Sequence, residues 1–124
     1  MNEDYVSFEV AKLLKEKRFN WPCQAFYDAN GMLAISPVHT INDELEDSDI
    51  ACPTLYVAQK WLREERGIEV VIVPSDAQKR TYVFFVWNYK GLVNFIEPSS
   101  KSDGNHNDYG RCLNDGISEA LKLI

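Results

Sequence analysis

The residues best suited to chemistry in this sequence are a cysteine and a histidine, Cys52 and His106. Cys52 immediately precedes Pro53, and proline suits the first position of a helix because its missing N–H would have no partner there. A thiol at a helix N-terminus is activated when the helix dipole and a nearby histidine base favour the thiolate. The pair therefore supports one functional hypothesis, a thiol hydrolase with Cys52 as nucleophile and His106 as base.

Other features of the sequence oppose this hypothesis. Pro53 removes an amide that would steady a thiolate, and the segment 43–49, "DELEDSD", places five acidic residues just before Cys52. A helix dipole contributes about 1 kcal/mol at an exposed site, which neighbouring carboxylates can cancel. The order of cysteine and later histidine resembles papain-like cysteine hydrolases, but a polar third residue cannot be identified. The sequence favours Cys52 as a helix-entry residue.

Two oxygen-rich segments, 43–49 and 98–107, raise the question of a bound cation. Neither has the glycine at the sixth position and the glutamate at the twelfth that a calcium loop requires. The three cysteines lack the close pairs of a zinc site or a disulfide framework, and the common nucleotide-binding motifs do not occur. We therefore expect no cofactor and no metal, with weak cation binding by the two loops left open.

The spacing of apolar residues predicts three helices. They cover residues 7–18 with Ser7 as N-cap, a segment that begins after Cys52 and ends at Arg66, and the residues from 108 to the end of the chain.

Strand patterns occupy the segments between these helices. Asn30-Gly31 predicts a hairpin of strands 24–29 and 32–36, because this pair tolerates positive φ at both turn positions. The remaining assignments are strands at 68–73 and 81–88, a further strand within "GLVNFIEP" from Gly91, and a solvated loop at 37–51. The expected fold is α+β, an antiparallel sheet of four or five strands packed with three helices in the order α-β-β-α-β-β-(β)-α. We expect one compact domain over residues 1–124.

Strands 68–73 and 81–88 are apolar on both faces, which requires that both faces be covered. Three helices cover little more than one face of such a sheet. The aromatic residues Tyr82, Phe84 and Trp87 are therefore predicted to lie at or near the contact of a homodimer.

The net charge of −6 and the pI near 4.8 disfavour binding to nucleic acid, because phosphate groups are repelled. The same charge supports an alternative hypothesis, an acidic inhibitor that mimics nucleic acid. The first residues, "MNEDYVSFEV", lack the basic and apolar segments of a signal peptide, and a long apolar run is missing. We therefore expect a cytoplasmic protein that does not enter a membrane.

Three segments, "DYVSFEVAKLLKEKRF", "PTLYVAQKWLREERGIEVVIVPS" and "SEALKLI", resemble a group of short uncharacterised proteins of gut Bacteroidetes genomes and their phages or mobile elements. The resemblance implies a small accessory protein and transfers no site residue. Because the residues assemble no catalytic constellation, the leading hypothesis is a non-enzymatic binding or interaction module with an unknown protein partner, serving a mobile element.

Overall fold

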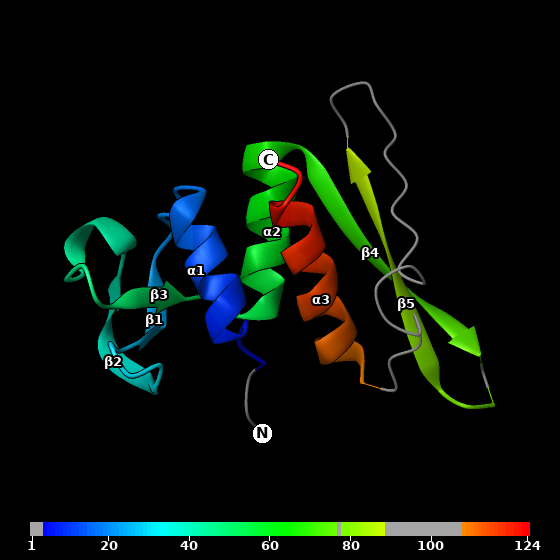
Figure 1. The fold of residues 1–124 in the computed structure, drawn as a ribbon, viewed down its shortest axis with the longest axis horizontal. Coiled ribbons are helices and arrows are strands. Elements are labelled where there is room, and N and C mark those ends of the chain that lie inside the picture. The colour runs from blue at the N-terminus through cyan, green and yellow to red at the C-terminus, as the bar shows by residue number, and fades with distance from the viewer. Residues whose placement is uncertain (1–3, 77, 89–107) are drawn as a thin grey trace. The chain divides into compact units, whose positions relative to one another are not determined.

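The computed structural model describes residues 4–76, 78–88 and 108–124. Within them lie three α-helices, one short 3-10 helix and five strands in two antiparallel sheets, which confirms the α+β class (Figure 1). The chain divides into two compact units, Met1–Trp61 and Leu62–Ile124. The expectation of a single domain stays a prediction. No helix in the described residues is long and apolar enough to cross a membrane.

The first unit consists of a three-stranded sheet with a helix packed on one face. Its elements are α1 (Phe8–Glu16), β1 (Cys23–Tyr27), β2 (Leu33–Thr40), the 3-10 helix η1 (Asn42–Glu44), β3 (Ile50–Cys52) and the first turns of α2 (Leu55–Arg66). The strand order is β2-β1-β3, so β1 is central and β2 lies at an edge. Tyr27 of β1 packs its ring against Phe8 of α1 at a centroid distance of 5.4 Å, which places α1 on the face that carries Tyr27.

Helix α1 begins and ends with recognisable caps. The Ser7 hydroxyl accepts a hydrogen bond from Val10 N at 3.3 Å, which confirms the predicted N-cap. At the other end Arg18 has φ of +69°, and Phe19 N donates to Leu14 O at 2.9 Å. This is the arrangement of a Schellman motif, with arginine where glycine is usual. The helix therefore stops before residue 18, and the chain turns towards β1.

The predicted hairpin forms, but its turn differs from the one expected. Gly31 has φ of +76°, whereas Asn30 does not have positive φ. Gly31 N donates to Asp28 O at 2.9 Å, and the Asp28 carboxylate accepts from Asn30 N and Met32 N. Because Asp28 holds the loop with its own side chain, only one residue has to adopt the left-handed conformation.

The prediction of a solvated loop at 37–51 was wrong at both ends. Strand β2 continues to Thr40, and Ile50–Cys52 forms β3, which pairs antiparallel with β1. A bulge in β2 allows this extension, because the partner of Ala25 is Ile35 but the partner of Cys23 is Thr40. All three residues of β3 are buried. A short run between acidic residues and a proline carries too little periodicity to be recognised as a strand.

The second unit contains a long hairpin and the C-terminal helix. Strands β4 (Ile68–Asp76) and β5 (Thr81–Asn88) pair along their length, and α3 (Tyr109–Leu121) packs on one face of the pair (Figure 1). The predicted strands and the C-terminal helix are confirmed. The five described strands form two sheets, however, in place of the single sheet expected. The strand proposed from Gly91 lies outside the described residues.

Candidate functional site

Cys52 is the last residue of β3 and does not stand at the start of a helix. Pro53 and Thr54 separate it from α2, and the Thr54 hydroxyl accepts a hydrogen bond from Val57 N at 3.2 Å. The prediction that the helix starts immediately after Cys52 was therefore wrong by two residues. Thr54 caps the helix, and Cys52 lies two residues before this cap, within β3.

The Cys52 thiol is enclosed by backbone carbonyl groups. Its sulfur lies 3.5 Å from Val6 O and 3.8 Å from Pro53 O, and its side chain is 1% exposed. Val6 is held there because its N–H donates to Pro53 O at 3.2 Å. Burial raises the pKa of Cys52 from an ordinary value near 9 to about 12. A thiol in this environment stays protonated and is a poor nucleophile.

We expect the Cys52 thiol to be unreactive in the folded protein. At pH 8, iodoacetamide should leave Cys52 unmodified over a time in which it alkylates the same residue completely in denaturant, because both burial and the raised pKa suppress the thiolate. Peptide mapping by mass spectrometry measures the modified fraction. Rapid alkylation of native Cys52 at pH 7 would contradict the structure and restore the hydrolase hypothesis.

The other half of the predicted catalytic pair, His106, lies outside the described residues, as does the segment 98–107. The pairing of Cys52 with His106 therefore stays a prediction. The described histidine, His39, is exposed on β2.

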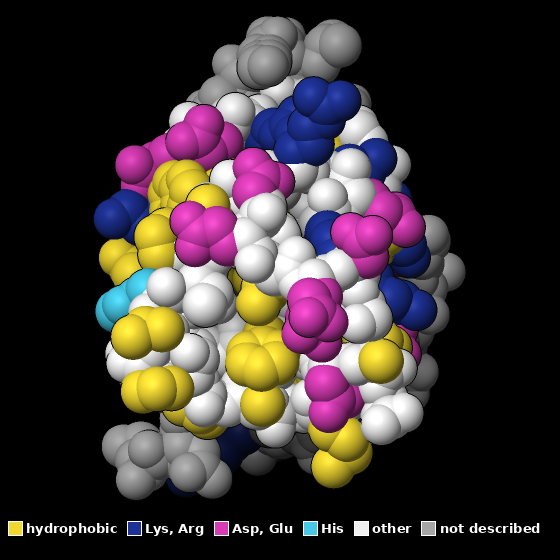
Figure 2. Space-filling view, turned by 90° about the vertical axis from the view of Figure 1, so that its left-hand side faces the viewer, with side chains coloured by type: hydrophobic (Ala, Val, Ile, Leu, Met, Phe, Trp, Pro, Cys, Tyr) yellow, Lys and Arg dark blue, Asp and Glu magenta, His cyan; other side chains and the backbone are white. Residues whose placement is uncertain are grey.

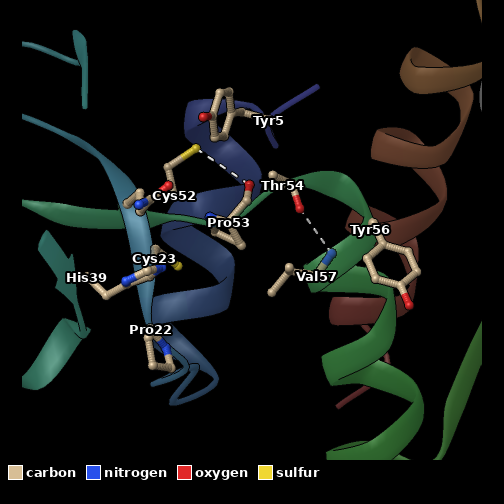
Figure 3. Close-up of a pocket in the computed structure, with 10 residues that line it drawn as sticks. Tyr5, Pro22, Cys23, His39, Cys52, Pro53, Thr54, Tyr56 and Val57 are labelled. Atoms are coloured by element: carbon tan, nitrogen blue, oxygen red, sulfur yellow. Dashed lines mark hydrogen bonds between the residues drawn. The ribbon is translucent and has the colours of Figure 1, made fainter. Parts of the chain in front are cut away.

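Cys52 borders a surface pocket of about 320 Å³ in the first unit (Figure 3). Cys23 and Cys52 come from the strand side of the pocket, and Tyr56 and Val57 come from α2. The Cys23 thiol lies 3.5 Å from Trp21 O, and burial raises its pKa to about 12 as well. The pocket has room for a small molecule, but its thiols are protonated. Within the described residues, His, Cys, Asp and Glu side chains form no group of three that could hold a metal ion.

The acidic segment 43–49 is anchored to α1. Lys15 Nζ donates to Asp47 O at 3.0 Å and to Asp49 O at 3.1 Å. Asn20 and Asp43 exchange two hydrogen bonds of 3.0 Å. The lysine ammonium therefore binds backbone oxygens of this segment, and weak cation binding by its carboxylates stays a prediction.

Of the three rings predicted at a dimer contact, Phe84 is buried at 3% exposure and packs beneath α3. Tyr82 is half-buried and meets Tyr109 edge to face at 5.4 Å. Trp87 is 38% exposed. Phe84 therefore has no surface to offer a second copy, and the role of the other two rings stays a prediction.

Sequence reasoning missed a different apolar surface, which we call the β2 patch. It comprises four exposed side chains, Met32 (64%), Leu33 (43%), Ile35 (62%) and Val38 (63%). Figure 2, which views the molecule from this side, shows several groups of hydrophobic side chains at the surface, with other surface between them. A signal was available: every residue from Ala29 to Asn42 lacks a formal charge at pH 7, which is unusual for an edge strand.

No protein-family model matches the chain, and no curated protein or solved structure is significantly similar to it. The resemblance to short proteins of Bacteroidetes and their mobile elements stays a prediction.

Proposed function

We propose that this chain is a non-enzymatic interaction module that binds an extended protein segment along the outer edge of β2. The observation that carries the proposal is the β2 patch, a set of exposed apolar side chains on the edge strand of a sheet and on Met32 just before it. Edge strands normally carry charges that prevent pairing with other chains. A bulge or a proline can also prevent such pairing, but in β2 both the bulge and Pro37 follow Ile35. The segment from Met32 to Ile35 therefore lacks this protection.

The hydrogen-bond pattern of the hairpin indicates that this edge presents backbone groups. Asp28 N donates to Met32 O at 3.0 Å, so these two residues form a hydrogen-bonded pair. Hydrogen-bonded and non-hydrogen-bonded pairs alternate along an antiparallel ladder. Leu33 and Ile35, which face Tyr27 and Ala25, therefore form non-hydrogen-bonded pairs. Their N–H and C=O groups point away from β1 and can pair with an added strand.

The side chains of the same two residues would supply apolar contacts. Leu33 and Ile35 lie on the face of the sheet that carries Ala25, which is fully buried beside them. The buried face of the sheet thus continues onto β2, where both side chains remain exposed. A bound strand would bury this apolar surface and satisfy the edge amides together.

The other two functions receive less support. The buried, protonated Cys52 is unsuited to nucleophilic catalysis. On the face shown in Figure 2, acidic side chains form separate groups with uncharged surface between them, whereas a mimic of nucleic acid needs a continuous acidic stripe. An accessory role in a mobile element rests on the sequence resemblance alone.

Binding of a synthetic strand tests the proposal. A short peptide with isoleucine and leucine at alternate positions should slow hydrogen exchange at the Leu33 and Ile35 amides, measured by NMR, because these amides become paired. A peptide with lysine at the same positions is the control. Ile35→Lys should weaken peptide binding at least tenfold, since an ammonium would replace an apolar contact. Unchanged exchange at both amides, or binding that Ile35→Lys does not affect, would contradict the proposal.

A further inference from the structure

The lack of charge on β2 bears on what its partner is. The chain carries a net charge of −6, so two copies repel each other on average. The run from Ala29 to Asn42 is the longest stretch of the sequence without Asp, Glu, Lys or Arg, and it contains the whole of β2. Two copies that meet along β2 therefore bring no like charges face to face. A basic partner, by contrast, would find no acidic side chain on this strand.

We infer that the segment bound at this edge is β2 of a second copy. The two strands are paired antiparallel about a twofold axis that passes between Ala34 of one copy and Ala34 of the other. This inference rests on the proposed function and names its partner. The outward-pointing N–H and C=O groups of Leu33 then face those of Ile35 in the other copy. By symmetry, Ile35 faces Leu33 of the other copy in the same way. Each of these pairs exchanges two hydrogen bonds, so the register provides four.

The ends of β2 limit the pairing to this register. Pro37 would face Gly31 of the other copy, and proline has no N–H to extend the ladder. The bulge, which begins after Ile35, turns the strand away from a regular edge at the same place. Within the register, Leu33 of each copy lies beside Ile35 of the other on the α1 face. Aliphatic cross-strand pairs of this kind stabilise antiparallel sheets.

The association state of the full chain is the first test. Sedimentation equilibrium should show a concentration-dependent shift from 14.3 kDa towards twice that mass. Ile35→Lys should weaken dimerisation at least tenfold. Tyr56→Lys is the matched control, because Tyr56 is 64% exposed against 62% for Ile35 but lies on α2, outside the β2 patch. It should change the dissociation constant less than threefold. Both substitutions are at exposed positions, and circular dichroism verifies the fold.

Cross-linking tests the register. Ala34 faces Ala34 of the other copy in a non-hydrogen-bonded pair, where the short Cα separation suits a disulfide. Ala34→Cys should therefore give a covalent dimer on mild oxidation, whereas Ser36→Cys should not. The native cysteines in the described residues, Cys23, Cys52 and Cys112, are buried and should not cross-link.

Each result supports or overturns the inference. A shift in mass that Ile35→Lys abolishes, together with cross-linking at Ala34, supports it. A monomer at every concentration overturns it, as does a dimer that survives Ile35→Lys and is lost in Trp87→Lys. Cross-linking at Ser36 in place of Ala34 rejects the register. If the chain stays monomeric but binds the strand peptide at β2, the inference fails and the proposed function stands; if neither occurs, both fail.

Discussion

Replacing Asn42 by alanine is expected to lower the free energy of unfolding by about 2–4 kcal/mol. Asn42 is 8% exposed and is the buried polar side chain of the described residues. Its amide nitrogen donates to Phe19 O at 2.8 Å, and its amide oxygen accepts from Ala51 N at 2.9 Å. Alanine would leave both backbone groups buried without partners, since Phe19 and Ala51 are almost fully enclosed. Urea denaturation measures the loss.

Asn20 provides the matched control for this substitution. It also makes two hydrogen bonds through its side-chain amide, both to Asp43, but these bonds are exposed to solvent. Water can replace them, so Asn20→Ala should cost less than about 1 kcal/mol. Equal losses in the two variants would show that the hydrogen bonds of Asn42 do not owe their strength to burial.

Asn42→Asp separates the two hydrogen bonds. The introduced carboxylate can still accept from Ala51 N, but as an anion it cannot donate to Phe19 O. The folded protein should therefore raise the pKa of this group above its unfolded value near 4. A raised acid pKa means that stability relative to the parent is highest below about pH 4 and falls as the pH increases. A cost independent of pH would contradict this account.

Asn42 also shows why the structure of its region could not be predicted from the sequence. The segment 37–51 combines a proline, acids and small residues, which is the composition of a solvated loop. Its structure depends on contacts distant along the chain: Asn42 binds Phe19, and Lys15 holds Asp47 and Asp49. Such contacts leave no periodic pattern. The helices were predictable because their apolar spacing and their caps at Ser7 and Asp108 are local signals.

The candidate site was harder to predict than the fold. Cys52 before Pro53 suggested a helix N-terminus, yet the cap is Thr54 and Cys52 belongs to β3. The short strand is defined by its pairing with β1, and its thiol is buried against the backbone carbonyls of Val6 and Pro53. The β2 patch could be anticipated only from the missing charges. Its exposure follows from the position of β2 at the sheet edge, which the strand order determines.

At Gly116, the effect of glycine on helix propensity and its effect on tertiary packing oppose each other. In the middle of α3, glycine reduces helix stability by about 1 kcal/mol relative to alanine, and the sequence shows only this weakness. The structure shows that α3 packs closely against the β4–β5 hairpin here. A Cβ atom at Gly116 would lie 2.7 Å from Val70 Cγ1 and 3.1 Å from Phe84 Cγ. Both neighbours are buried and cannot move aside freely.

Gly116→Ala should therefore destabilise the protein by about 1–3 kcal/mol, because overpacking outweighs the gain in helix propensity. Gly110→Ala, in the half-exposed first turn of α3, is the control and should change stability by less than 1 kcal/mol. Val70→Ala removes the nearest contacting methyl groups, so Gly116→Ala should cost at least about 1 kcal/mol less in that background than in the parent chain. Urea unfolding of all four members of this double-mutant cycle measures the coupling. Strictly additive losses would mean that α3 does not press on Val70. The close contact would then no longer explain why glycine occupies this position.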